Sequence, residues 1–308
     1  MAVRRMDYTV MSKCPTTGIT VVVFRLSAEM VSYEMASTNL VHVTYRLCLT
    51  SCPSSGSSVC LPGWKHNSDF TSELGSGAAP DGDVDAIVGM IFALRAVEAN
   101  GGSAPAWYNE VLEWADASCT AFLKYNTAYH QSYGDRLLKL GSCWGGWYPN
   151  GNNPSYHSPG SYKIMRDFHV NYPYSRSYAM PNFEEGDLSA TWNNLIDTSH
   201  DVIHATKCQD AIGMVPNWAK VTVENNQIVH VNESFSGSNT PQWEFGAEAS
   251  RTIWRLALDA VVYPDEMNLG AYSNLELLLK QLDSEFSTAF NKSWSDTAVS
   301  STREKYRH

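Results

Sequence analysis

The spacing of apolar residues changes along the chain, from no regular period in the first 60 residues to a helical period from residue 83 onward. In residues 83–99 and 107–125, apolar side chains recur every three or four positions, which predicts two amphipathic helices. Two glycines and a proline between these segments predict the break that separates them. The same pattern predicts further helices over residues 187–207, 245–262 and 274–290, and a short helix that begins at Ser158 and Pro159.

Residues 220–231 alternate apolar and polar positions about a polar turn at 224–227, which predicts a β-hairpin. The predicted helices are joined by long loops rich in Gly, Pro, Asn and Tyr. This organisation favours an all-α barrel or toroid in which the loops at one end build a cleft. We expect one mainly helical domain over residues 61–308. Residues 1–60 form a divergent N-terminal segment whose place inside or outside that fold is open.

Composition narrows the class of protein. The chain has 308 residues, of which 44% are hydrophobic and 18% charged, as is typical of a globular protein. Its net charge of −10 leaves no broad basic surface, so we expect no nucleic-acid partner. No apolar run approaches the ~20 residues of a membrane helix, so we expect no membrane partner, and no signal peptide is recognisable. The sequence leaves the oligomeric state open.

The residue types that bind metals do not form a metal motif. The seven cysteines contain no C-x-x-C pair, and no histidine stands beside them at zinc spacing. His200 and His204 lie one helical turn apart, but no third ligand accompanies them. No D-D-x-x-D motif, typical of prenyl and terpene enzymes, is present. We therefore expect neither a metal nor a cofactor.

Three carboxylates, Asp81, Asp83 and Asp85, stand at alternate positions where the first predicted helix begins. A calcium loop of this type needs Gly and Glu further on, where this chain has Ala86 and Phe92. Acidic residues also cap helix N-termini and interact favourably with the helix dipole. Three acids so close together repel one another, however, so the pattern leaves two hypotheses, helix capping and a carboxylate that faces a substrate.

Two later segments combine aromatic and charged residues. Trp144 and Trp147 flank two glycines, and an Asn-Pro-Ser-Tyr turn that ends in Tyr156 follows them. Glycine beside tryptophan lets a ligand or a backbone approach the indole face, although aromatic packing explains the pattern equally well. Glu248 and Arg251 are three residues apart and share a helix face, as a surface ion pair or as part of a cleft. With 10 Trp and 16 Tyr, the chain suits stacking on sugar rings or a large aromatic core.

Four motif segments follow one another along the chain: A-P-D-G-D-x-D at 79–85, W-G-G with N-P-S-Y-x-S-P at 144–159, G-x-V-P-N-W at 213–218 and F-G-A-E-A-S-R-T-x-W-R at 245–255. Together these segments resemble glycoside hydrolase family 8 over about residues 61–264. The resemblance implies an (α/α)6 barrel with a loop-built cleft, in which both ends of the barrel diverge from the family. It implies inverting hydrolysis of a β-1,4-linked polysaccharide such as cellulose, xylan, mixed-linkage glucan or chitosan, and an extracellular location.

The same resemblance implies roles for individual residues. Glu248 would be the general base, and Asp81 would hold the distorted sugar at the cleavage point. Tyr156 and Arg251 would orient the attacking water and the base. The sugar platforms would be Trp64, Trp144 and Trp147.

The chain departs from the family pattern at both catalytic carboxylates. The family commonly has Asp at the base position, and some relatives take the base from an upstream loop, which makes Glu233 and Glu244 alternatives to Glu248. The family's acid lies in an S-E-G-x-G-Y-like segment, for which this chain offers only Glu29 and Glu34, without the glycines. A second hypothesis is therefore a glycan-binding relative that has lost its general acid.

Overall fold

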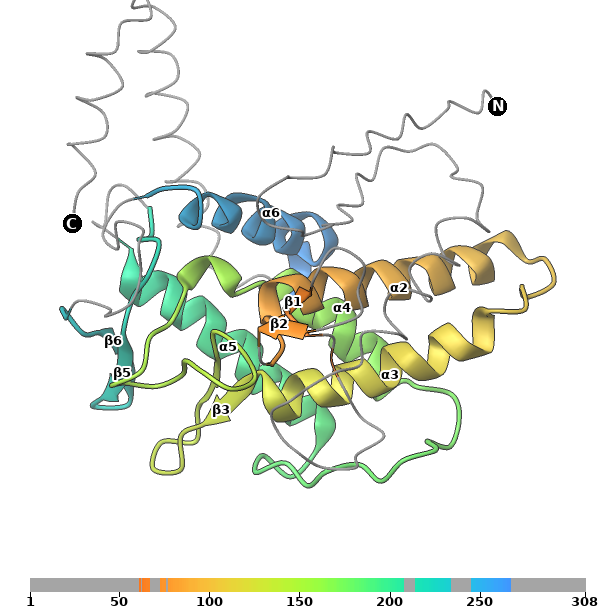
Figure 1. Ribbon diagram of the computed structural model, residues 1–308, viewed down its shortest axis with the longest axis horizontal. Coiled ribbons are helices and arrows are strands. Elements are labelled where there is room, and N and C mark those ends of the chain that lie inside the picture. Colours follow the sequence, from red (N-terminus) through yellow and green to blue (C-terminus); the bar gives the residue numbers. More distant parts are fainter. Residues whose placement is uncertain are drawn as a thin grey trace, which may run out of the picture.

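The computed structural model describes residues 61, 63–66, 73–75, 77–207, 214–233 and 245–266, which form a mainly helical structure (Figure 1). The helices predicted over residues 83–99, 107–125 and 187–207 and from Pro159 are confirmed, with small shifts at their ends. The predicted helix over 274–290 and the segment 1–60 lie outside the described residues. The helices are α2 (Pro80–Asn100), α3 (Tyr108–Tyr125), α4 (Pro159–Val170), α5 (Leu188–Thr206) and α6 (Thr252–Val262).

The helix predicted over residues 245–262 begins later than expected. Residues 249–251 form a 3-10 turn, η2 (Ala249–Arg251), and α6 follows it. Oδ1 of Asn217 accepts hydrogen bonds from the backbone N–H groups of Gly246 and Ala249, at 3.1 and 3.0 Å. A side chain from a distant segment thus binds the free N–H groups at this start, a contact that apolar spacing does not reveal.

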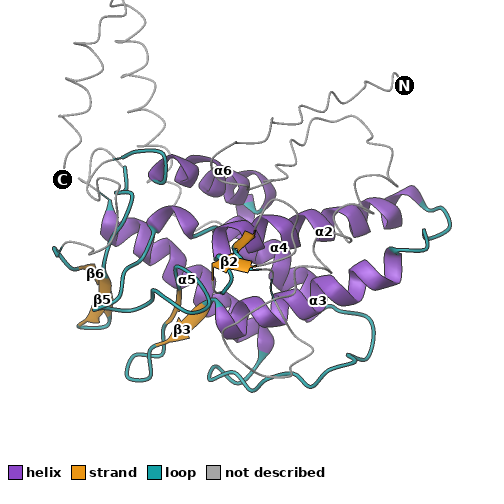
Figure 2. Ribbon diagram, in the orientation of Figure 1, coloured by secondary structure: helices purple, strands orange, loops and turns teal. Residues whose placement is uncertain are grey.

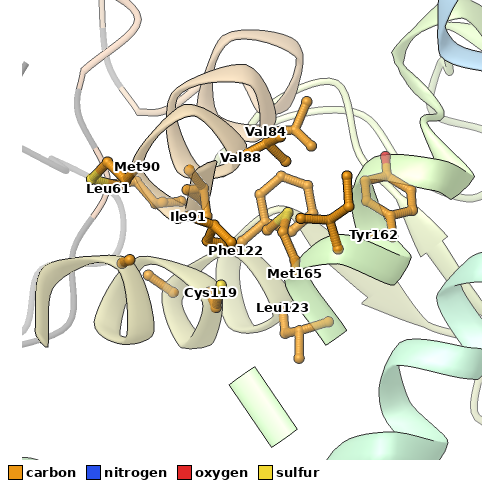
Figure 3. Packing of buried hydrophobic residues seen from close by; sticks show 14 of the residues in the cluster. Leu61, Val84, Val88, Met90, Ile91, Cys119, Phe122, Leu123, Tyr162 and Met165 are labelled. Carbon is orange, nitrogen blue, oxygen red and sulfur yellow. The ribbon is translucent and has the colours of Figure 1, made fainter. Parts of the chain in front are cut away.

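The core lies between α2, α3 and α4, and α4 also packs against α5 and α6. Figure 3 shows Val88 and Ile91 of α2 pointing toward Phe122 of α3, with Met165 of α4 beside them. The apolar stripes that predicted α2 and α3 face this core, and Trp192, Leu195 and Ile196 of α5 also pack against it. At Gly160, a Cβ atom would lie 2.5 Å from the backbone nitrogen of Asp259, so only glycine lets α4 and α6 approach this closely.

The described part of the chain also contains three two-stranded antiparallel sheets (Figure 2). The predicted hairpin is confirmed, and Asn225 and Asn226 form its turn with positive φ angles of 51° and 60°. The other two sheets were not predicted, because strands of two or three residues are too short to show an alternating pattern. The sheets pair β1 (Lys65–His66) with β2 (Glu73–Gly75), β3 (Thr127–Tyr129) with β4 (Arg136–Leu138), and β5 (Val221–Glu224) with β6 (Gln227–His230).

The predicted fold class is confirmed as mostly helical with a small hairpin. The closed barrel, and the division of the chain at residue 60, stay predictions, because the described residues contain only the helices α2 to α6. Each helix in these residues is too short or too polar to cross a membrane.

Candidate active site

Arg251 joins two of the predicted site carboxylates. It ends η2, and its Nη1 donates a hydrogen bond to Oδ2 of Asp81 at 2.6 Å, while its Nη2 donates to Oε2 of Glu248. Its guanidinium also lies over the ring of Tyr156, 4.9 Å from the ring centroid. The side chains of Asp81, Arg251 and Glu248 are 20–29% exposed, so they are partly open to a ligand. The structure therefore brings four of the predicted site residues together. Asp81, Tyr156, Glu248 and Arg251 are called the Arg251 cluster below.

Asp81 does not cap α2. The N-cap residue is Ala79, which has no side-chain cap, and the carboxylate of Asp81 instead faces Arg251. Asp83 turns into the core, where it accepts a hydrogen bond from Nδ2 of Asn126 at 2.7 Å and where burial raises its pKa well above the usual value. Asp85 faces Arg255 at 3.5 Å. The three alternating acids thus have three different environments, and only Asp81 contacts the Arg251 cluster directly.

Tyr156 ends the 3-10 turn η1 (Pro154–Tyr156) and lies in a partly buried aromatic environment. Its ring meets Trp218 edge-on, with centroids 6.2 Å apart. Burial, reinforced by the negative charge of Asp81 and opposed by Arg251, raises the pKa of Tyr156 to about 12. The phenol therefore stays protonated at neutral pH and can donate a hydrogen bond from its hydroxyl.

His157 anchors the turn that carries Tyr156, a contact that the sequence did not predict. Its Nδ1 lies 2.9 Å from Oγ of Ser199 on α5, and its Nε2 lies 3.0 Å from Oδ1 of Asn152. Burial, together with the positive charge of Arg255, lowers the pKa of His157 to about 3, so the imidazole is neutral at physiological pH. The anchor therefore consists of two neutral hydrogen bonds, one from the loop to α5 and one within the loop.

Arg255 is a second missed residue. It lies one helical turn after Arg251, its side chain is buried, and its Nη2 donates to the backbone carbonyl of Asp81 at 3.2 Å. Together, Arg251 and Arg255 tie α6 to the first turn of α2. Their spacing of four in the segment A-S-R-T-I-W-R was the signal that could have identified the pair, since such residues share a helix face.

Trp64 and Trp144 form an edge-to-face pair with ring centroids 6.3 Å apart, and Trp64 is 44% exposed. The loop of Trp144 is tied to the approach to α2, because the N–H of Ser142 donates to the carbonyl of Ala78. Gly141 packs against Trp144, where an added Cβ would lie 2.3 Å from the indole. Both tryptophans are thus near the segment that leads into Asp81, and their roles as sugar platforms stay predictions.

Trp147 lies in a different environment. Its indole N–H donates to the carbonyl of Ala128 at 2.9 Å, and its ring meets His130 edge-on at 5.2 Å. It also packs against the small apolar cluster of Leu137, Val202 and Val221. These contacts place it beside β3 and the hairpin rather than in the Arg251 cluster, and its role as a sugar platform stays a prediction.

Of the alternative catalytic carboxylates, Glu233 alone lies within the described residues. Glu233 lies after the hairpin, where it pairs with Lys220 and accepts a hydrogen bond from the hydroxyl of Tyr148, each at 3.2 Å. Glu29, Glu34 and Glu244 lie outside the described residues. The structure therefore supplies no position for the general acid.

Comparisons with known proteins identify relatives of one kind. Endoglucanase A of Acetivibrio thermocellus is 25% identical over 222 residues, which cover 70% of this chain and 36% of the relative. Endoglucanase C of Ruminiclostridium cellulolyticum is 26% identical over 185 residues, covering 59% of this chain and 30% of the relative. Over this segment, the chain resembles bacterial endoglucanases. The resemblance to family 8 endoglucanases that the motifs indicated is thereby confirmed for a segment of the chain.

The endoglucanase-like segment is only part of such a protein, since the chain spans about a third of the length of these relatives. No family model matches the chain. Among solved structures, the endo-β-1,4-glucanase CMCax of Acetobacter xylinum has a TM-score of 0.43 and 15% identity, covering 71% of this chain and 60% of that one.

The cluster around Arg251 offers the groups that acid–base chemistry needs on one side of a reacting bond. Asp81 and Glu248 provide carboxylates, Tyr156 provides a protonated hydroxyl, and Arg251 provides a fixed positive charge between them. Within the described ranges, no group of three or more His, Cys, Asp or Glu side chains is placed to hold a metal ion. That observation does not extend to the rest of the chain, so the prediction of a metal-free site stays open.

Proposed function

We propose that the chain hydrolyses β-1,4-linked glucan, the polymer class of cellulose, as an endoglucanase. Two independent observations support the proposal, namely the similarity to bacterial endoglucanases and the convergence of the motif residues in space. The observation that carries it is the contact of one guanidinium with two carboxylates, Asp81 and Glu248. Asp81 lies 170 positions before Arg251, whereas Glu248 lies only three before it, and the sequence motifs alone predicted that both carboxylates would serve one site.

In the proposed reaction, water attacks the anomeric carbon from the face opposite the leaving oxygen, and the configuration inverts. Glu248 accepts the proton of that water, while a general acid gives a proton to the leaving oxygen. Such a pair of carboxyl groups stands about 6.5–9.5 Å apart, which leaves room for the water between the base and the sugar. The acid is supplied from outside the described residues, with Glu29 and Glu34 as the candidates.

The other residues of the cluster act on geometry. Asp81 accepts hydrogen bonds from the sugar at the cleavage point and holds it in the distorted form that resembles the transition state. The protonated hydroxyl of Tyr156 orients the water, and Arg251 holds the carboxylate of Glu248 in place. An (α/α)6 barrel is the scaffold that we propose for these groups.

A glycan-binding protein without turnover is the second candidate. It is favoured by one sequence observation, namely that neither Glu29 nor Glu34 is followed by the glycines of the family's acid motif. A protein that lacks the acid would leave the departing oxygen to take its proton from water, which costs about 10²–10⁴-fold in rate.

Proton NMR of a soluble cello-oligosaccharide during hydrolysis tests the proposal. We expect the α-anomer at the new reducing end first, followed by slow conversion to the equilibrium mixture. Initial release of the β-anomer would contradict the inverting mechanism. Saturable binding without any new reducing end would favour the glycan-binding candidate. Parallel samples of xylan, mixed-linkage glucan and chitosan would define the substrate range.

A further inference from the structure

Asn153 lies beside Glu248 in the described structure, and its side chain is almost completely buried. It caps the 3-10 turn η1, where its Oδ1 accepts hydrogen bonds from the backbone N–H and the hydroxyl of Ser155, at 2.9 and 2.7 Å. A backbone N–H can only donate, so the atom that it meets must be the amide oxygen. The orientation of the amide is thereby determined, and its NH₂ group must point away from the turn.

The NH₂ group points toward the proposed base. Nδ2 of Asn153 donates a hydrogen bond to Oε2 of Glu248 at 3.1 Å, across 95 positions in the chain. Arg251 donates to the same oxygen, Oε2. With two donors on Oε2, the rotation of the carboxylate is defined, and Oε1 is the oxygen that neither of these two donors occupies.

We propose that Asn153 is a positioning residue that orients the carboxylate of Glu248 for activation of the water. This inference rests on the proposed function, because it assigns Asn153 a role only if Glu248 is the base. Glutamate has one more rotatable bond than the aspartate that is common at this position, so a defined orientation requires an additional contact. Asn153 supplies that contact from a turn that Pro154 makes rigid.

Asn153 provides a constraint that Arg251 cannot provide alone. Arg251 divides its guanidinium between Asp81 and Glu248, so a sugar that binds Asp81 also affects the donor on Glu248. Asn153 makes no such division, because its other polar atom is bound within its own turn. Asn217 holds the backbone around Glu248 instead. Its Oδ1 accepts hydrogen bonds from the N–H groups of Gly246 and Ala249, which lie on either side of Glu248 in the chain.

The substitution Asn153→Asp separates this role from a structural one. Aspartate keeps the oxygen that accepts both hydrogen bonds from Ser155 and caps a turn as well as asparagine does, so folding is preserved. It replaces the donor to Glu248 by a negatively charged oxygen, which disfavours ionisation of the neighbouring carboxylate. In the described structure, the charged side chains near Glu248 are Arg251, which is bound to it directly, and Asp81, which is bound to Arg251. The substitution Asn153→Asp alters neither of them.

We expect Asn153→Asp to lower kcat on soluble β-glucan about 10- to 100-fold and to move the acidic limb of kcat/KM to higher pH by about one unit. The same repulsion lowers the stability of the folded protein slightly, so Tm should fall by only a few degrees and the variant should stay folded. Asn100→Asp adds the same charge at the far end of α2, about 30 Å from its start, and should leave both the rate and the pH profile unchanged.

The outcomes separate the inference from the function on which it rests. If the wild type hydrolyses glucan and Asn153→Asp keeps both its kcat and its acidic limb, Asn153 does not position the base and this inference alone is overturned. A uniform loss of rate with an unmoved acidic limb also contradicts it, because general disorder of the turn would give that result. If the wild type releases no reducing sugar under any condition, the proposed hydrolysis fails, and the role of Asn153 fails with it.

Discussion

Oδ2 of Asp81 lies 2.6 Å from Nη1 of Arg251, although 170 residues separate the two in the chain. This contact joins the first turn of α2 to the turn that precedes α6. Because the same guanidinium also binds Glu248 and covers the ring of Tyr156, a change at any one of these residues alters the environment of the others. The predictions below therefore separate binding, turnover and stability.

Asp81→Asn should affect turnover far more than stability. An ion pair that is partly exposed contributes about 0.2–1 kcal/mol, so the free energy of unfolding should change little. If Asp81 holds the distorted sugar, hydrolysis of β-glucan should fall by about 100-fold or more, since such contacts supply several kcal/mol in the transition state. Asp85→Asn removes an equal charge four residues later and should keep the activity. Full activity in Asp81→Asn would contradict a role at the cleavage point.

Trp144→Ala should remove most of the quenching of tryptophan fluorescence by cello-oligosaccharides, if its indole stacks on a sugar ring. Gly141→Ala should weaken the same response, because the added Cβ would lie 2.3 Å from the indole and must displace it. Trp254 is 53% exposed on α6, so Trp254→Ala provides a control that should keep saturable quenching. Wild-type protein that shows no saturable quenching would count against a glycan cleft.

Asp83→Asn should stabilise the protein at neutral pH. Burial raises the pKa of Asp83 in the folded protein, so the protonated carboxyl favours folding. Its contribution to the free energy of unfolding is lost as the pH rises through the folded-state pKa. Asparagine avoids that loss, which amounts to about 1.4 kcal/mol for each unit by which the pKa is raised. Urea unfolding at pH 7 should show the gain, which should disappear near pH 3. A variant less stable than the wild type at pH 7 would contradict this account.

The sequence predicted the parts of the fold that depend on local pattern. The helices α2, α3 and α5 were found because each carries an apolar stripe long enough to define a period. The strands β1 to β4 were missed because a strand of two or three residues is too short to show an alternating period. Similarly, apolar spacing placed the start of the last described helix too early, since its true start depends on Asn217, about 30 residues upstream.

For the candidate site, the motif residues were predicted from the sequence, whereas the contacts that support them were not. The motifs predicted that Asp81, Tyr156, Glu248 and Arg251 belong together, and the structure places them in one cluster. The supporting contacts could not be predicted, because Asn153 meets Glu248 only after the chain folds, and the identity of a turn residue does not reveal its distant partner. Trp147 follows the two glycines that Trp144 precedes, and it packs elsewhere because its indole N–H donates a hydrogen bond to the carbonyl of Ala128.

Tyr156→Phe should separate the hydroxyl from the ring. The phenylalanine ring can still lie beneath Arg251, so binding of cello-oligosaccharides should be kept. Without the hydroxyl, the attacking water loses one oriented hydrogen bond, and kcat should fall about 10- to 100-fold. The remaining activity should show no change in its alkaline limb below pH 10, because burial raises the pKa of this phenol to about 12. An unchanged kcat would show that the hydroxyl does not orient the water.

The most direct measurement is the release of reducing sugar from soluble β-1,4-glucan by Glu248→Gln, compared with the wild type and with Glu233→Gln. Glutamine keeps the shape of the side chain but cannot accept the proton, so the rate should fall by about 10²–10⁴-fold. Affinity for cello-oligosaccharides, measured by fluorescence quenching, should survive. Glu233 pairs with Lys220 beside the hairpin, so Glu233→Gln should match the wild type. A Glu248→Gln protein that hydrolyses glucan at the wild-type rate would contradict the assignment of Glu248 as the base.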